Sequence, residues 1–331
     1  RQTKAEITNV VDDAGFLNGS IADGGLSNDR TPTISGTLNA VLAAGETVRI
    51  YSETAGVTSY LGNAVVNNVA KTWSFTPLTP LPNSANVVFT FTAKVADATG
   101  NESLASKPRL FLLDSLNPAD VATITNVHDD VGFITGSIAD GSFTNDPTPR
   151  IEGTLPSALG PNETLRVFDG DTFLGNADVD NANKTWSFTP SPLPLTPGRT
   201  YAISTRIADA AGNMGPNSVS RSFVLDTSAP LTTAGVSDVI DDGGDVLRPV
   251  LQGGSTDDPT PIITGILSAA LGANETIRIY NAPLAGNPEF LGEAFVVDPV
   301  DPLNRLKWSF TPTTQLQAGF YRIEARVADA A

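Results

Sequence analysis

Two sequence motifs each occur three times, at a spacing that matches the length of a whole small domain. A motif of alternating residues that ends in two aspartates returns twice, and so does the motif Trp-Ser-Phe-Thr-Pro. The first motif occupies residues 7–13, 124–130 and, more loosely, 236–242, and the second occupies residues 73–77, 186–190 and 308–312. A period of roughly 110 to 120 residues is too long for one solenoid unit. It predicts three tandem domains, at residues 1–116, 117–229 and 230–331.

The three repeats are unequal at their ends. The third stops at residues 328–331, whereas the first two continue through Gly100-Asn101 and Gly212-Asn213 into another strand-like segment. We therefore expect the third domain to be truncated before its last strand, in a chain taken from something longer. No stretch approaches the 18 or so consecutive apolar residues of a membrane span, and the first residues do not lead into the apolar part of a signal peptide.

Composition restricts the chemistry. The chain has no cysteine, which removes disulfides, thiolate metal sites and a cysteine nucleophile from consideration. Its formal net charge of −16 comes from 36 acidic and 20 basic residues. Nucleic acids and anionic membranes select basic surfaces, so the charge argues against both as partners and favours cations.

Strands are indicated by short runs of β-branched and aromatic residues that Gly, Pro, Asn and Asp clusters separate. About seven short strands per repeat are typical of an antiparallel immunoglobulin-like β-sandwich, and a closed barrel is the alternative. The fold class predicted is therefore all-β, with three such sandwich domains in an elongated array. In the first repeat we expect strand A at residues 7–10, B at 33–38, C at 47–51, E near residue 73, F at 89–95 and G at 109–113.

The repeated Trp and Phe residues are two positions apart, so they share one face of a strand. We interpret Trp73 with Phe75, Trp186 with Phe188 and Trp308 with Phe310 as core residues. The alternative is a platform on which a carbohydrate ring stacks.

The sandwich topology predicts at which end of its domain each recurring acid lies. In an immunoglobulin-type sandwich the B–C and F–G loops share the leading end of the domain, and the A–B loop shares the trailing end with the end of strand G. If consecutive repeats stack end to end, acids of one trailing end face acids of the next leading end. The first junction then joins Asp12, Asp13, Asp23, Asp29 and Asp114 to Glu163 and Asp209, the second joins Asp129, Asp130, Asp140, Asp146 and Asp226 to Glu275 and Asp329, and the third repeat adds Asp241, Asp242 and Asp258.

Such carboxylates repel one another unless a cation lies between them. Calcium takes six to eight oxygen ligands, tolerates irregular geometry and needs no histidine or cysteine. We therefore predict Ca²⁺ sites at the junctions. The alternative is that these aspartates form turns, which Asp-Gly and Asn-Asp sequences favour whatever ions are present.

The spacing of the acids is specific. Two of them are sixteen residues apart in every repeat, although the sequence between them drifts. The third repeat departs from the others in having Gln252 where they have Asp23 and Asp140, which leaves its site in doubt. The pairs are Asp13 with Asp29, Asp130 with Asp146 and Asp242 with Asp258.

Several short motifs recur in order along the chain, namely Asp-Asp-x-Gly, Asp-Gly-Gly or Asp-Gly-Ser, Asn-Asp-x-Thr-Pro, Asn-Glu-Thr, Trp-Ser-Phe-Thr-Pro and Ala-Asp-Ala-x-Gly-Asn. With these motifs the chain resembles the bacterial immunoglobulin-like repeats of giant biofilm-associated and non-fimbrial adhesins that are exported by type I secretion, and the resemblance covers essentially all 331 residues. The resemblance implies an extender region, outside the bacterial cell, in which calcium at domain junctions stiffens a rod. The ligands it implies are Asp12, Asp13, Asp29 and Asp114 and their counterparts Asp129, Asp130, Asp146 and Asp226.

Catalysis has little support in the sequence. The one histidine, His128, is replaced by Val11 and Ile240 in the other repeats, and we read it as a loop residue. Carboxylate pairs serve glycosidases, but here they recur in every repeat, and a catalytic centre is seldom needed three times.

We therefore expect a non-enzymatic stalk segment of a bacterial surface adhesin, whose immediate partners are neighbouring repeats of the same chain. One alternative is a module that itself binds a host glycan or protein, for which the insertions at residues 281–289 and 299–305 of the third repeat are the best candidates. Another is an accessory array of an extracellular enzyme.

Overall fold

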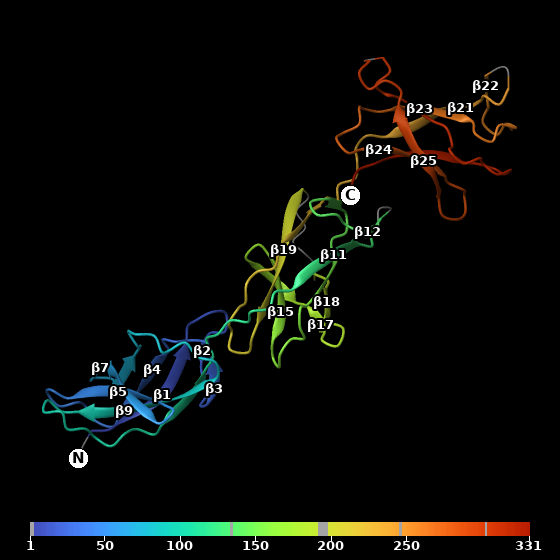
Figure 1. Ribbon diagram of the computed structural model, residues 1–331. Coiled ribbons are helices and arrows are strands. Elements are labelled where there is room, and N and C mark those ends of the chain that lie inside the picture. The colour runs from blue at the N-terminus through green and yellow to red at the C-terminus, as the bar shows by residue number, and fades with distance from the viewer. Residues whose placement is uncertain (1–2, 133–134, 191–197, 245–246, 302) are drawn as a thin grey trace. The chain divides into compact units, whose positions relative to one another are not determined.

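The computed structural model describes every residue except 1–2, 133–134, 191–197, 245–246 and 302. All regular elements among the described residues are β-strands, and none of these residues lies in a helix, so no apolar helix in this part could cross a membrane. The strands form five sheets (Figure 1). This arrangement confirms the predicted all-β class of tandem β-sandwiches.

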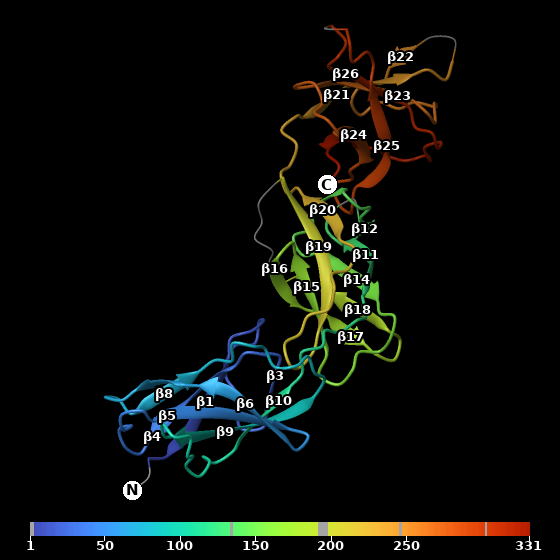
Figure 2. The same ribbon diagram turned by 60° about the vertical axis from the view of Figure 1, so that its left-hand side comes forward.

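The first repeat holds two five-stranded sheets, with the orders β2-β1-β4-β8-β7 and β3-β10-β9-β5-β6. β3 pairs with β10 in parallel, and the other pairs of these sheets are antiparallel (Figure 2). The strands are β1 (Ala5–Asp12), β2 (Gly19–Ser20), β3 (Gly25–Ser27), β4 (Thr33–Leu38), β5 (Thr47–Thr54), β6 (Val57–Asn63), β7 (Val65–Asn67), β8 (Thr72–Phe75), β9 (Val87–Ala96) and β10 (Arg109–Leu113).

The six strands predicted in this repeat correspond to β1, β4, β5, β8, β9 and β10, with β4 and β10 at the predicted bounds. The other four were not predicted, for two reasons. β2, β3 and β7 have only two or three residues, which is too short for an alternating pattern. β6 is mostly exposed, so its sequence carries no buried alternate positions.

The second repeat shows the same two sheet orders, β12-β11-β14-β18-β17 and β13-β20-β19-β15-β16. Its strands are β11 (Thr123–Asp129), β12 (Gly136–Ser137), β13 (Phe143–Thr144), β14 (Arg150–Thr154), β15 (Thr164–Asp169), β16 (Thr172–Asn176), β17 (Asp178–Asp180), β18 (Thr185–Phe188), β19 (Arg199–Ala208) and β20 (Arg221–Leu225).

In the third repeat a single long strand pairs with members of both layers, and the described strands form one seven-stranded sheet of order β22-β21-β23-β26-β25-β24-β27. β27 pairs with β24 as β9 pairs with β5. The described residues that follow β27 contain no further strand. The strands are β21 (Ala234–Asp241), β22 (Arg248–Pro249), β23 (Ile262–Leu267), β24 (Thr276–Asn281), β25 (Glu289–Val296), β26 (Lys307–Phe310) and β27 (Ile323–Ala328).

The chain divides into two compact units whose boundary passes through the second repeat. Unit 1 comprises Arg1–Val127, Arg150–Pro190 and Ala202–Arg221, and unit 2 comprises His128–Pro149, Ser191–Tyr201 and Ser222–Ala331. This division does not follow the repeat boundaries, so the three domain limits stay a prediction.

The core of each repeat depends on a tryptophan packed against a glycine of the neighbouring strand. Trp73 on β8 lies directly opposite Gly36 on β4, and a Cβ atom on Gly36 would lie 2.4 Å from Cζ2 of the indole and 1.9 Å from the Glu6 carbonyl. The three indoles are buried, at 2%, 3% and 0% exposure for Trp73, Trp186 and Trp308. The core assignment is therefore confirmed, and the carbohydrate platform is excluded for these rings.

This packing predicts that Gly265→Ala is strongly destabilising. A Cβ there would lie 2.0 Å from the Gly235 carbonyl and 2.1 Å from Cζ2 of Trp308, and overpacking of this kind costs about 1–3 kcal/mol. We expect a lower midpoint in thermal unfolding of the whole chain. Gly235→Ala on the paired strand is the control, because its Cβ would come no closer than 3.7 Å to a neighbouring atom. Equal midpoints for the two variants would contradict the packing argument.

Candidate functional site

The A–B loop of the first repeat is built around two buried aspartates. Asp12 ends β1, and its Oδ1 accepts a hydrogen bond of 2.8 Å from Ala14 N. Asp29 follows β3, and its Oδ1 accepts one of 2.7 Å from Thr31 N. Each carboxylate thus closes a turn two residues ahead of itself, which is the usual Asx-turn geometry. We call this element the aspartate loop.

A hydroxyl group joins the two carboxylates. Ser27 Oγ donates to Asp12 Oδ2 at 2.6 Å and accepts from Asp29 N at 3.0 Å. Asp29 Oδ2 also accepts from Asp13 N at 3.3 Å. Ser27 therefore connects Asp12 to Asp29, and the sixteen-residue spacing of Asp13 and Asp29 corresponds to a hydrogen bond that the Asp13 N–H donates to the Asp29 carboxylate.

The aspartate loop recurs in the other repeats. In the second, Thr144 Oγ1 donates to Asp129 Oδ2 at 2.5 Å, and Asp130 N donates to Asp146 Oδ2 at 3.4 Å. In the third, Asp242 N donates to Asp258 Oδ2 at 3.0 Å.

The third loop differs in one respect, because an arginine approaches its first aspartate. Arg248 Nη2 lies 3.5 Å from Asp241 Oδ2. A shallow cavity of about 540 Å³ opens beside this pair, lined also by Thr256 and Asp257.

The electrostatics of the loop favour a cation. Burial raises the pKa of Asp29, and the nearby charges of Asp12 and Asp13 raise it further, against hydrogen bonds from Thr31 and Asp13 that lower it. In the third repeat, desolvation and the neighbouring Asp258 raise the pKa of Asp242, whereas the pKa of Asp258 is lowered, chiefly by the Thr260 N–H. In the first and third loops, one carboxylate is therefore less readily ionised than an exposed aspartate.

The donor chemistry suits calcium, although the side-chain arrangement is sparse. The hydrogen bonds of the loop bring together carboxylate oxygens of Asp12 and Asp29 and the Ser27 hydroxyl oxygen, and carboxylate oxygens are typical calcium ligands. Within the described part of the chain, no three His, Asp or Glu side chains are grouped so as to hold a metal ion. A calcium ion here would thus need backbone carbonyls and water to complete its coordination.

Asp23 and Asp140 each accept a backbone hydrogen bond from the last strand of their own repeat. Asp23 Oδ1 accepts a hydrogen bond of 2.8 Å from Leu110 N on β10, and Asp140 Oδ1 accepts one of 2.6 Å from Ser222 N on β20. None of the described hydrogen bonds connects either residue to the aspartate loop. In the third repeat Gln252 occupies the corresponding position of the sequence.

Glu163 and Glu275 close the turns in which they lie. Their Oε2 atoms accept hydrogen bonds of 2.7 Å from Gly160 N and Gly272 N. Glu46 makes the same bond to Ala43 N at 2.8 Å in the first repeat. The pattern was missed in the sequence, where only the Asn-Glu-Thr form of the second and third repeats stood out.

One amide connects the first two repeats. Asn213 Nδ2 donates to Asp209 Oδ2 within its own turn and to the Asp114 carbonyl at the end of β10, both at 2.8 Å. These residues all belong to unit 1. The predicted proximity of Asp114 and Asp209 is therefore real, but it runs through the Asp114 carbonyl, since the Asp114 carboxylate accepts from Leu116 N.

At the corresponding positions around the second junction, the acids also close local turns. Asp226 Oδ1 accepts from Ser228 N and Asp329 Oδ1 accepts from Ala331 N, each at 3.0 Å. No described contact joins Asp226 to Asp329. Asp97 holds the same turn in the first repeat, where hydrogen bonds from Asn101 and Thr99 keep the pKa of its carboxyl well below the usual range.

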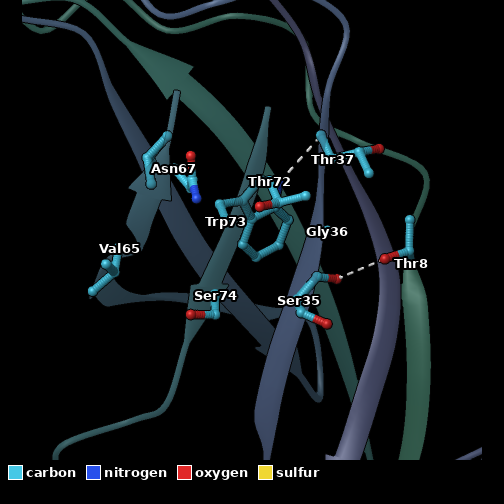
Figure 3. A pocket seen from close by; sticks show the side chains of 10 residues that line it. Thr8, Ser35, Gly36, Thr37, Val65, Asn67, Thr72, Trp73 and Ser74 are labelled. Carbon is cyan, nitrogen blue, oxygen red and sulfur yellow. Dashed lines mark hydrogen bonds between the residues drawn. The ribbon is translucent and has the colours of Figure 1, made fainter. Parts of the chain in front are cut away.

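A second hollow lies on the outer face of the first repeat and offers no catalytic set. It measures about 420 Å³ and lies over β4, β7 and β8. Figure 3 shows Thr8, Ser35, Asn67 and Trp73 around it, and its lining contains no acidic, basic or histidine side chain. His128 is exposed, as expected, but it lies on strand β11 opposite Ser137 of β12, so its assignment to a loop was wrong.

No protein-family model matches the chain, and no curated protein matches its sequence. Among solved structures, it is similar to the FN1–FN3 domains of chicken CNTN1, with 10% identity over 98% of this chain and 99% of that one and a TM-score of 0.30. It is also similar to a 1.5-MDa bacterial ice-binding adhesin, with 17% identity over 86% and 80% of the chains and a TM-score of 0.26. A tetra-tandem repeat from the extending region of a large adhesion protein aligns at 20% identity over 92% and 68%, with a TM-score of 0.22. Scores this low carry no argument about function.

The aspartate loop predicts a measurable role for its bridging hydroxyl. Ser27→Ala leaves a buried Asp12 oxygen and the Asp29 N–H without their partner, which costs about 1–3 kcal/mol. We expect faster hydrogen exchange at the Asp29 amide, measured by NMR. Ser74→Ala, at an exposed position of β8, is the control and should leave that amide unchanged. Unaltered exchange in both variants would show that the hydroxyl does not hold the loop.

Proposed function

We propose that this chain is an extender segment of a bacterial cell-surface adhesin, outside the cell, in which tandem immunoglobulin-like repeats set a distance and do no chemistry. The observation that carries the proposal is the threefold recurrence of one loop geometry, with a buried aspartate pair in each repeat. A loop that recurs in every domain is expected to have a role in the repeat array as a whole. The type I secretion and biofilm role implied by the sequence motifs belong to this proposal.

Calcium is the proposed ligand of the aspartate loops. Asp12, Asp13 and Asp29 would hold it in the first repeat, with Asp129, Asp130 and Asp146, then Asp241, Asp242 and Asp258, as counterparts. The raised pKa of Asp29 supports the proposal, because it comes first from burial of the carboxylate and then from the charges of Asp12 and Asp13, and a bound cation would offset both. The Asp114 carbonyl and Asp209 lie at the junction of the first two repeats, where they offer further oxygens. An affinity near 10⁻⁴ to 10⁻³ M suits an extracellular module.

The proposal predicts that the exposed aspartates of the loops are needed for calcium binding. The combined variant Asp13→Asn, Asp130→Asn and Asp242→Asn should weaken binding at least about tenfold in isothermal titration, since each loop loses a charged ligand. In small-angle scattering, adding a few millimolar calcium after EGTA should reduce flexibility in the wild-type chain and not in the variant.

The control removes the same charge elsewhere. Glu53→Gln, Asp171→Asn and Asp238→Asn alter three exposed acids outside the loops and should leave titration and scattering as in the wild type. Identical wild-type scattering curves with EGTA and with calcium would sink the calcium proposal and leave the aspartates as turn formers.

A second candidate function is direct binding of a host glycan or protein by the third repeat. The two insertions specific to this repeat carry the largely exposed apolar side chains Leu284, Val300 and Leu303. Exposed apolar residues mark interaction surfaces when they gather. Glycan-array binding by the wild-type chain, lost when all three are changed to Ser, would favour this function, whereas an array without signal would disfavour it.

A further inference from the structure

One arginine of the second repeat lies between two phenyl rings that come from different repeats. Arg166 is on β15, and its Cζ atom lies 3.9 Å from the ring centroid of Phe16 and 3.9 Å from that of Phe173. Phe173 is on the adjacent strand β16, whereas Phe16 belongs to the aspartate loop of the first repeat. All three residues belong to unit 1.

Among the described residues, no carboxylate forms an ion pair with Arg166, whereas its counterparts in the other repeats each have one. In the first repeat Arg49 Nη1 lies 3.1 Å from Glu102, and in the third Arg278 Nε lies 3.6 Å from Glu293. In the second repeat Met214 takes the place of Glu102, as the bridges from Ala96 to Glu102 and from Ala208 to Met214 show.

The two phenyl faces provide what a carboxylate would otherwise supply. Arg166 Nε is buried without a hydrogen-bond partner, and burial lowers the pKa of the guanidinium. The negative face of an aromatic ring attracts a guanidinium, most strongly where the cation is desolvated. Two faces therefore stabilise a partly buried cation that has no carboxylate partner among the described residues.

The backbone brings Phe16 to this position. Gly15 has a φ of +70°, and a Cβ there would lie 3.3 Å from the Gly212 carbonyl of the second repeat. Gly212 belongs to the same turn as Asn213, which donates to the Asp114 carbonyl. The ring contact and the amide contact thus act at one junction, and the ring contact includes none of the oxygens proposed as calcium ligands.

We propose that the Arg166–Phe173 face of the second repeat is a docking surface for an aromatic side chain from the aspartate loop of the preceding repeat, and that this stack joins the first two repeats without calcium. Because of this stack, the stability of the junction depends on whether the second of the two repeats leaves its arginine without a carboxylate. A repeat with a carboxylate beside this arginine, as the first has in Glu102, neutralises the charge internally and has less need of the ring.

Electron spin resonance distance measurement between the repeats tests the proposal. The chain has no cysteine of its own, so Val69→Cys and Val219→Cys, both at exposed positions, place one spin label in each repeat. In EGTA, Phe16→Ala should broaden the distance distribution and raise the open population roughly 5- to 30-fold, the equivalent of losing about 1–2 kcal/mol.

Three further variants separate the causes. Phe16→Tyr should preserve the narrow distribution, and Phe16→Leu should broaden it, because an aliphatic side chain has no π face. Phe320→Ala removes an exposed ring of the third repeat and should have no effect. Circular dichroism confirms that each variant is folded.

If the distance distribution of Phe16→Ala in EGTA equals that of the wild type, the proposal is wrong. If the distance distribution of Phe16→Leu equals that of the wild type, the contact is apolar and does not depend on the π face of the ring. These outcomes are independent of the calcium proposal, which is tested by adding calcium to a chain with Phe16 intact.

Discussion

Each sandwich depends on the contact between an indole and a strand backbone that carries no side chain. Trp73 occupies the space that a Cβ on Gly36 would fill, and the same pairing recurs at Gly153 with Trp186 and Gly265 with Trp308. A large aromatic ring buries more apolar area than any other core residue, so the glycine lets the most stabilising side chain lie flat against the sheet. The loops at both ends of the repeat are then free to vary.

The aspartate loop places two carboxylates in a buried position that the core alone would not tolerate. Ser27 and the Thr31 N–H supply hydrogen bonds, whereas burial and, to a smaller extent, the charges of Asp12 and Asp13 raise the pKa of Asp29. The pKa of Asp29 is higher in the folded state than in the unfolded state, so folding favours the protonated carboxyl group. The stability that protonation contributes is therefore lost as the pH rises from the unfolded-state pKa through the folded-state pKa. At neutral pH the loop therefore carries a cost that a bound cation would offset.

Much of the fold was predictable from the sequence, and the site was predictable only in part. The alternation in β4 and β10 and the paired Trp and Phe residues each identified buried faces, because burial leaves a period of two. The role of Gly36 was not predictable, since it depends on what lies across the strand pair. Sixteen-residue spacing indicated that Asp13 and Asp29 act together. Spacing could not show that Asp23 pairs with β10, or that Arg166 has exchanged a carboxylate for two rings, because both depend on contacts distant in sequence.

At the junction of the first two repeats, repulsion between acids favours separation, and two other contacts favour association. The acids of the aspartate loop and Asp209 add negative charge on both sides of it, and like charges at short range favour separation. The Phe16–Arg166–Phe173 stack and the Asn213 amide favour contact, and they do so with a positive charge and neutral donors. If the stack offsets the repulsion in the absence of calcium, the ion only has to add the remaining stabilisation. A weak calcium site would then suffice, which is the regime in which extracellular calcium levels control binding.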